Sequence, residues 1–160
     1  MLETVGEVRG RKKLQKMVFI AQNLGYPFGE PFELHVWGPY SEVLATKLKE
    51  MTDWGFAAEE ELPGPAGNHL YVYRPGPNAA RASGGSSEDR LADLVTYLNS
   101  QDATLLEGAA TLMYLKAKGA DPAAAAEMLG RLKPDKYADP ARVQAAQAFV
   151  HTLDTYRTDG

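Results

Sequence analysis

The spacing of apolar residues along this 160-residue chain changes once, and that change constrains the fold most. Residues 1 to about 77 mix helical spacing with the alternating spacing of strands, whereas the chain from about residue 88 onward has helical spacing only. Between the two parts, residues 78–87 are small and polar and include glycine and serine, as in a flexible linker. The pattern predicts an α+β fold that is mostly helical, with a small antiparallel sheet in the first part.

The clearest element of the first part is a helix from Gly10 to Leu24. Gly25 directly follows it, at the position where a left-handed helix cap favours glycine. The apolar residues of this helix recur at i, i+3, i+4, i+7 and i+10 and form one stripe: Leu14, Met17, Val18, Ala21 and Leu24.

Four further elements follow this helix in the first part. Phe32–Trp37 alternates apolar and polar residues like a strand, and Gly38-Pro39 predicts a turn. Ser41 is a suitable N-cap for a helix that carries apolar residues and ends near Trp54. Phe56–Leu62 and His69–Arg74 are extended runs joined by a loop of turn residues, which predicts a β-hairpin.

This order of elements is that of a winged helix-turn-helix, in which the hairpin is the wing. The segment of residues 25–40 is longer than a tight helix-turn-helix turn and contains a strand, which departs from the plain motif. We expect a winged-helix-like domain at residues 1–77 and, at residues 88–160, about four helices. These helices form either a bundle of their own or a layer on the first domain.

Positive charge is concentrated at the start of the first long helix, in a chain whose net charge is −4. Arg11, Lys12 and Lys13 fall in the first helical turn, where the helix dipole disfavours each positive charge by about 0.3–1 kcal/mol. An anion bound there would reverse the penalty, and Gly10 would let its backbone approach closely. A phosphate of DNA or RNA is the natural candidate. The cations are Arg9, Arg11, Lys12, Lys13 and Lys16, and helical geometry places Lys12, Lys16 and Asn23 on the face opposite the apolar stripe.

An alternative interpretation is a solvated helix face, neutralised by Glu3, Glu7 or the acidic run of residues 59–61. The helix from Ser41 to Trp54, which would read DNA in a winged helix, has three acids and two lysines among its charged residues, and residues 1–77 carry eight cations and ten anions. We therefore expect weak sequence specificity, with contacts centred on the basic helix. Lys47, Lys49 and Arg74 are candidate additional phosphate contacts.

Other functional classes lack a signal in the sequence. The chain has no cysteine, which fits a reducing cytoplasm, and no apolar run long enough to span a membrane. His35, His69 and His151 are far apart and lack metal-type spacing, and no phosphate-binding loop or nucleophile elbow is present. We expect no catalytic residues, cofactor or metal site. Trp37, Tyr40, Trp54, Tyr71 and Tyr73 are aromatic residues that either stack on bases or belong to the core.

The string GRKKLQKMVFIAQNLGYPF, followed by FELHVWGPYSEVLATKLKEMTDWGF, resembles the YwgA-like family of bacterial proteins. In the second half, LLEGAATLMYLKAKG and LGRLKPDKYADPARVQAAQAF resemble the same family's helical region with its Leu-Lys-Pro turn. The resemblance implies a bacterial cytoplasmic protein with a winged-helix-like N-terminal part. It brings no established activity, so no catalytic residue is carried over.

These observations support two hypotheses. The first is a nucleic-acid-binding or regulatory winged-helix protein whose basic helix contacts phosphates and whose C-terminal helices pack together or form a homodimer. The second is a protein-interaction adaptor with a winged-helix shape, whose basic helix binds an acidic partner protein. The acidic character of the helix from Ser41 to Trp54 favours the second hypothesis.

Overall fold

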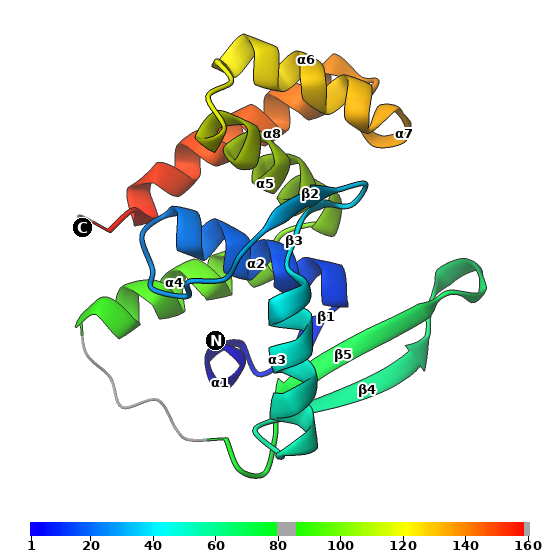
Figure 1. Cartoon of the computed structure of the whole chain (residues 1–160), viewed down its shortest axis with the longest axis vertical. Coiled ribbons are helices and arrows are strands. Elements are labelled where there is room, and N and C mark those ends of the chain that lie inside the picture. The colour runs from blue at the N-terminus through cyan, green and yellow to red at the C-terminus, as the bar shows by residue number, and fades with distance from the viewer. Residues whose placement is uncertain (80–85, 159–160) are drawn as a thin grey trace.

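The helix predicted from Gly10 to Leu24 lies at the centre of the molecule as α2, Arg11–Asn23 (Figure 1). The backbone of Gly25 has φ +100°, as expected for the residue that ends the helix. All five residues of the predicted apolar stripe are buried. The helix also buries side chains on its other faces, Gln15, Lys16, Phe19 and Ile20 among them, so that it is enclosed on most sides.

The computed structural model describes residues 1–79 and 86–158, and the predicted linker of residues 78–87 falls mostly outside them. Two 3₁₀ turns occur at Pro65–Gly67 and Asp154–Tyr156. The remaining elements beside α2 are α1 (Leu2–Val5), β1 (Val8–Arg9), β2 (Glu33–His35), β3 (Gly38–Tyr40), α3 (Glu42–Asp53), β4 (Ala57–Pro63), β5 (His69–Pro75), α4 (Ser86–Ser100), α5 (Ala103–Ala117), α6 (Pro122–Leu132), α7 (Pro134–Tyr137) and α8 (Pro140–Leu153).

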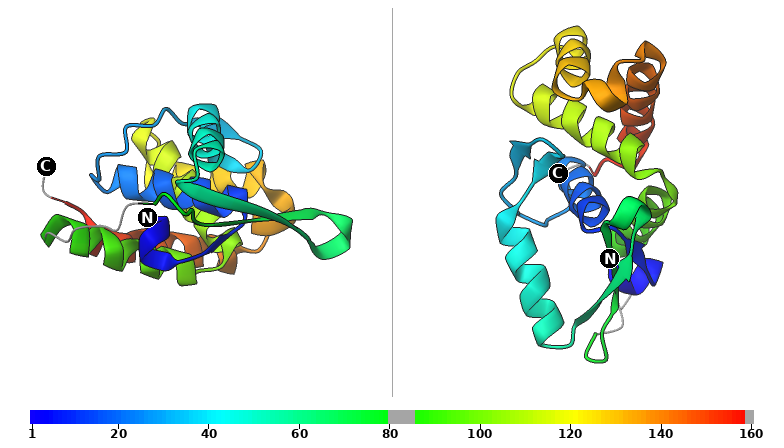
Figure 2. Two further views of the ribbon diagram at one scale, coloured as in Figure 1. Left: turned by 90° about the horizontal axis from the view of Figure 1, so that it is seen from below. Right: turned by 90° about the vertical axis from the view of Figure 1, so that its right-hand side faces the viewer.

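The predicted β-hairpin is confirmed as β4 and β5, which pair from Ala57↔Pro75 to Pro63↔His69. It projects from the helical body as a twisted ribbon (Figure 2). A third strand, β1, pairs with β5 through Val8↔Tyr73 and was not predicted, because two residues are too few to show a period. The sheet order is β1-β5-β4, so Arg9 lies on a strand and not on the basic helix.

A second, two-stranded sheet joins α2 to α3. The predicted strand in Phe32–Trp37 is confirmed as β2, but the turn predicted at Gly38-Pro39 is wrong. The turn lies at Val36 and Trp37, and the Gly-Pro pair belongs to β3, opposite β2. The position of Gly38 favours glycine, because its φ is +84° and a Cβ atom there would lie 3.0 Å from Thr111 Oγ1 and 3.1 Å from Lys16 Cε.

Helix α3 begins where predicted, with Ser41 Oγ accepting a hydrogen bond from the Leu44 N–H at 3.1 Å. Most of its apolar residues are not fully buried. Only Leu48 is buried, whereas Val43 and Met51 are exposed by 44% and 39%. The helix packs mainly on β4 and lies along one side of the molecule (Figure 2).

Three helices of the second part begin directly after an aspartate. The side chains of Asp102, Asp121 and Asp139 each accept hydrogen bonds from backbone N–H groups of the first turn of α5, α6 and α8. The short helix α7 was not predicted separately. Together with the sheets, these helices confirm a mixed α+β fold with a small antiparallel sheet and a helical C-terminal part.

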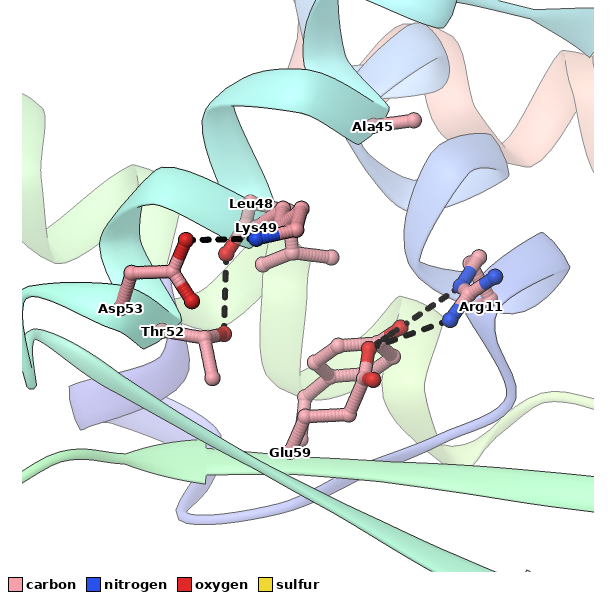
Figure 3. A pocket seen from close by; sticks show the side chains of 8 residues that line it. Arg11, Ala45, Leu48, Lys49, Thr52, Asp53 and Glu59 are labelled. Carbon is pink, nitrogen blue, oxygen red and sulfur yellow. Dashed lines mark hydrogen bonds and ion pairs between the residues drawn. The ribbon is translucent and has the colours of Figure 1, made fainter.

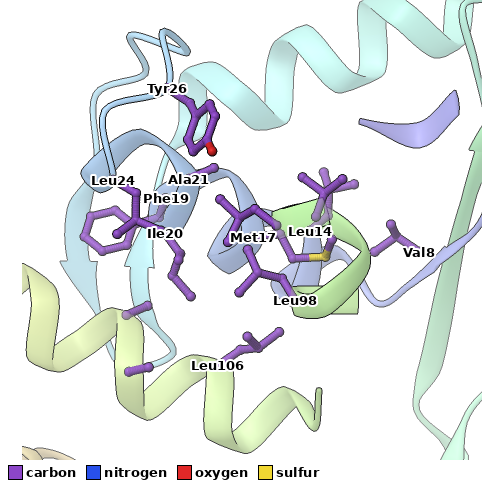
Figure 4. Close-up of a cluster of buried hydrophobic side chains, with 14 of the residues drawn as sticks. Val8, Leu14, Met17, Phe19, Ile20, Ala21, Leu24, Tyr26, Leu98 and Leu106 are labelled. Atoms are coloured by element: carbon purple, nitrogen blue, oxygen red, sulfur yellow. The ribbon is translucent and has the colours of Figure 1, made fainter. Parts of the chain in front are cut away.

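The two parts of the chain share one hydrophobic core. Met17 and Ile20 of α2 belong to the same buried cluster as Leu98 of α4 and Leu106 of α5 (Figure 4). Helix α2 contacts both α4 and α5, and α1 contacts α4. A smaller cluster between α5, α6 and α8 contains Leu129 and Ala146.

Candidate anion-binding site

A cavity of about 620 Å³ opens where the N-terminus of α2 meets the β2–β3 turn and β5. The long hairpin β4–β5 and the β2–β3 turn lie on the same side of the molecule as this helix end (Figure 1). We call it the α2 cavity. Its lining combines basic and aromatic side chains with one carboxylate, that of Glu42: Gly10, Arg11, Lys12, His35, Trp37, Tyr40, Glu42, Asn68, His69, Leu70 and Tyr71.

The first turn of α2 begins at this cavity, which Gly10, Arg11 and Lys12 line. The Gly10 N–H donates to the Tyr71 carbonyl at 2.8 Å, and the Leu14 N–H donates to the Gly10 carbonyl at 3.1 Å. The N–H groups between them, at residues 11–13, have no acceptor within the helix, and no described side chain caps this end. With its positive φ of +105°, Gly10 brings the backbone to the cavity surface.

Lys12 points to an aromatic ring of this cavity. Among the described residues it has no ion-pair partner. Its Nζ lies 4.1 Å from the ring centroid of Trp37, which is 45% exposed. Burial and the positive charge of Lys136 lower the pKa of Lys12. This ammonium group is therefore available to an incoming anion.

Arg11 takes part in both the α2 cavity and a neighbouring one of about 380 Å³ between α3 and the sheet (Figure 3). Its guanidinium lies 4.0 Å from the ring centroid of Tyr71. Its Nε donates to Tyr73 Oη at 2.9 Å, and its Nη2 lies 3.2 Å from Glu59 Oε2. The hydrogen bond to Tyr73 raises the pKa of Arg11, and burial raises the pKa of Tyr73 to about 12, so this group is an ion pair buttressed by a neutral tyrosine.

The other sequence candidates lie apart from the α2 cavity and have partners of their own. Arg9 pairs with Glu7 at 2.6 Å, and Lys13 donates to the Asn99 carbonyl at 2.5 Å. On α3, the partners are Glu30 for Lys47 at 2.8 Å and Asp53 for Lys49 at 2.6 Å; on β5, Arg74 pairs with both Glu7 and Glu60. Neutralisation by the protein's own carboxylates thus accounts for Arg9, Arg11 and Arg74.

The predicted solvent face of Lys12, Lys16 and Asn23 is wrong for Lys16, whose residue is only 1% exposed. Its Nζ donates to the Pro39 carbonyl of β3 at 2.7 Å, and burial lowers its pKa to about 8. The neighbouring Gln15 is also buried and exchanges two hydrogen bonds with the backbone of Ser41. The face is enclosed because β3 and α5 pack on the polar side of α2, which spacing within one helix cannot show.

A buried charged group on the C-terminal helices was not predicted from the sequence. The Glu107 carboxylate of α5 accepts hydrogen bonds from Lys133 and Lys136, both at 2.6 Å, and Lys133 also donates to the Val36 carbonyl. Burial alone would raise the pKa of Glu107, but the two lysines outweigh burial and lower it. The available signal was a single carboxylate within an otherwise apolar helix, in the segment LLEGAATLMYL.

A search of the described residues finds no helix of the length and hydropathy required to cross a membrane.

Comparison with known proteins identifies a Bacillus subtilis (strain 168) relative, the uncharacterized protein YwgA. The two sequences are 33% identical over 110 residues, which is 68% of this chain and 66% of the relative. The aligned region therefore spans slightly less than two thirds of that protein's length. No protein-family model matches the chain, and no solved structure matches it.

Proposed function

Because the chain belongs to the YwgA-like family, whose named relative is uncharacterized, we propose a function from the site geometry: the protein binds nucleic acid through phosphate contacts in the α2 cavity. One observation carries this proposal. Lys12 is exposed and has no ion-pair partner among residues 1–79 and 86–158; it stands beside the first turn of α2, which no described side chain caps, in a cavity walled by aromatic rings. Such a helix end binds phosphate groups through its N–H groups and its dipole.

The form of nucleic acid follows from the cavity walls. Trp37, Tyr40 and Tyr71 line the cavity, and aromatic rings stack only on bases that are unpaired. We therefore propose a single-stranded ligand held with weak sequence specificity. Of the other two aromatic candidates, Tyr73 is buried beneath Arg11 and Trp54 is exposed at the end of α3.

The winged-helix description belongs to this proposal. The order α2, α3 and the projecting β4–β5 hairpin supports it, whereas the two-stranded sheet between the helices departs from the plain motif. A plain winged helix would contact nucleic acid through α3. In the proposed complex the nucleic acid contacts the start of α2 instead. Lys47 and Lys49 already have carboxylate partners, so α3 offers few free cations to a duplex.

Charge reversal of Lys12 tests the proposal. We expect K12E to weaken binding of a fluorescein-labelled single-stranded oligonucleotide at least tenfold, measured by anisotropy at low salt. The slope of log K against log salt should be shallow, about −0.7 for each phosphate neutralised on a single strand. K116E is the matched control, because Lys116 is exposed near the far end of α5.

Equal binding by K12E and the unchanged protein would contradict the site assignment. Lys16 is unsuitable for this test, because reversing a buried charge would destabilise the fold and not the ligand contact alone.

A second candidate function, a protein-interaction adaptor, is favoured by the apolar side chains around α3. Val43, Met51 and Phe56 are each about two fifths exposed, and Trp54 is 64% exposed. The contact surface would then be α3 and not the basic helix, which is largely enclosed. Stoichiometric co-purification of a protein partner that is lost in W54E and retained in K12E would select this function.

A further inference from the structure

The charged groups around Glu107 do not balance. Three lysines contact the segment that carries the β2–β3 turn: Lys12 lies against the Trp37 ring, Lys133 donates to the Val36 carbonyl, and Lys16 donates to the Pro39 carbonyl. A fourth, Lys136, pairs with Glu107 beside Lys133. Within the described residues, the carboxylate that pairs with any of them is that of Glu107, which holds two of the four. We call these five residues the lysine cluster.

Burial makes this imbalance costly. Lys16 and Lys133 are 1% and 6% exposed, and an ammonium group in such a place needs compensation by charge and hydrogen bonds. Lys133 has Glu107 and the Val36 carbonyl as acceptors, whereas the three protons of Lys16 find one acceptor among the residues that the structure describes, the Pro39 carbonyl. The positive charges of these lysines that Glu107 does not balance therefore lie behind Lys12 and Trp37, which line the α2 cavity.

The pairing of the cations around the α2 cavity favours a short ligand. Each of the other cations named by the sequence outside the cavity, Arg9, Lys13, Lys47, Lys49 and Arg74, has an acceptor in the protein. These five cations, within the described part of the chain, therefore do not provide a row of free charges that a polynucleotide backbone could follow away from the cavity. The excess charge is instead gathered at one place, beside aromatic rings.

We propose that the ligand of the α2 cavity carries a doubly charged phosphomonoester next to an aromatic base, and that the lysine cluster selects this dianion over a singly charged phosphodiester. This inference rests on the proposed function and narrows it. Two sources share this chemistry: a free mononucleotide and the phosphorylated end of a strand. Lys12 contacts the phosphate, whereas Lys16, Lys133 and Lys136 act on it through the field of their charges and by positioning the β2–β3 turn.

Matched ligands test the inference. Three versions of one six-nucleotide strand are compared: one with a 5′-phosphate, one with a 3′-phosphate, and one with hydroxyl groups at both ends. Each competes with the same labelled strand for the protein. Adenosine monophosphate, adenosine and ribose 5-phosphate are competed in the same way. We expect at least one phosphorylated end to bind at least tenfold more tightly than the hydroxyl strand. Adenosine monophosphate should bind more tightly than both adenosine and ribose 5-phosphate.

Relative affinities identify the source. A mononucleotide that binds as tightly as the phosphorylated strand indicates a nucleotide ligand, whereas a tighter strand indicates a strand end. Equal binding of phosphorylated and hydroxyl strands would overturn the inference and leave nucleic-acid binding standing. Absence of binding by every probe at low salt would overturn both. Equal binding of ribose 5-phosphate and adenosine monophosphate would contradict the proposed contact between the base and the aromatic rings of the cavity.

One variant separates the cluster from the direct contact. In K136Q the half-exposed Lys136 is neutralised, while Lys133 still pairs with Glu107. We expect K136Q to reduce the preference for the phosphorylated end threefold to tenfold and to leave binding of the hydroxyl strand nearly unchanged, with K116Q as the matched control. A preference identical to that of the unchanged protein would show that the cluster does not select the dianion. Thermal unfolding confirms that each variant is folded.

Discussion

Helices α2 and α3 have similar lengths and both carry lysines and apolar residues, yet they occupy opposite environments. Helix α2 buries eight consecutive residues, from Leu14 to Ala21, including a glutamine and a lysine. Helix α3 buries Leu48 and exposes a valine and a methionine. The difference teaches that amphipathic spacing shows which side of a helix is apolar, whereas neighbouring elements decide how much of each side is covered.

Charge reversal should separate the two helices most strongly. K16E removes a buried ammonium and places a carboxylate near Glu107, so we expect a loss of about 3–5 kcal/mol in the free energy of unfolding or failure to fold. K49E, on the exposed face of α3, should cost no more than about 0.5–1 kcal/mol. Urea denaturation followed by circular dichroism measures both. Similar losses would contradict the contrast between the helices.

Truncation of one methionine in each helix compares their packing with residue type held constant. Met17 is fully buried in α2, and M17A should destabilise the protein by about 2–5 kcal/mol through lost contacts and a cavity. Met51 is 39% exposed in α3, and M51A should stay within about 0.5 kcal/mol. Denaturation midpoints at equal m-values give the comparison. If M51A lost as much unfolding free energy as M17A, the contrast in packing between α2 and α3 would be contradicted.

The buried lysine also predicts a dependence on pH. Burial lowers the pKa of Lys16 to about 8, compared with about 10.4 in an unfolded chain. Between these values the unfolded chain binds more protons, so the free energy of unfolding should rise by about 1.5 kcal/mol from pH 8 to pH 9.5. Denaturation of the unchanged protein and of K16M across this range isolates the effect, since K16M lacks this group. Parallel pH profiles would contradict the assignment. Staying below pH 10 avoids the titration of Tyr73, whose pKa is raised.

A further prediction concerns the start of α3. Ser41 Oγ accepts from the Leu44 N–H, and S41A should therefore cost about 1 kcal/mol. S41N retains a capping side chain and is the control, measured by thermal unfolding. The buried position of Ser41 limits N-cap replacements to small side chains, so a loss in S41N larger than in S41A would indicate crowding and not capping.

Local features of this fold were predictable from the sequence where a short segment determines them. The end of α2 at Gly25, the cap at Ser41 and the aspartates before α5, α6 and α8 depend on backbone chemistry within a few residues. The β4–β5 hairpin followed from its loop and the alternation around it.

Features that depend on distant segments were not predictable in this way. The burial of Lys16 requires β3 and α5, and the pairing of Glu107 requires a lysine 26 residues away. Strand β1 gains its identity from Tyr73 and its neighbours on β5, far along the chain. Of the candidate site, the sequence identified Gly10, Arg11 and Lys12, but the cavity that contains them is formed by three separate segments.

The β2–β3 turn has a consequence for how the protein is made. Its Val36 carbonyl is held by Lys133, which follows 97 residues later in the chain. Contacts of such sequence separation form late, because the intervening segment must first collapse. During synthesis, the emerging polypeptide can complete the β4–β5 hairpin well before the ribosome adds Lys133. The wall of the α2 cavity that carries Trp37 would then become ordered only after Lys133 has been translated.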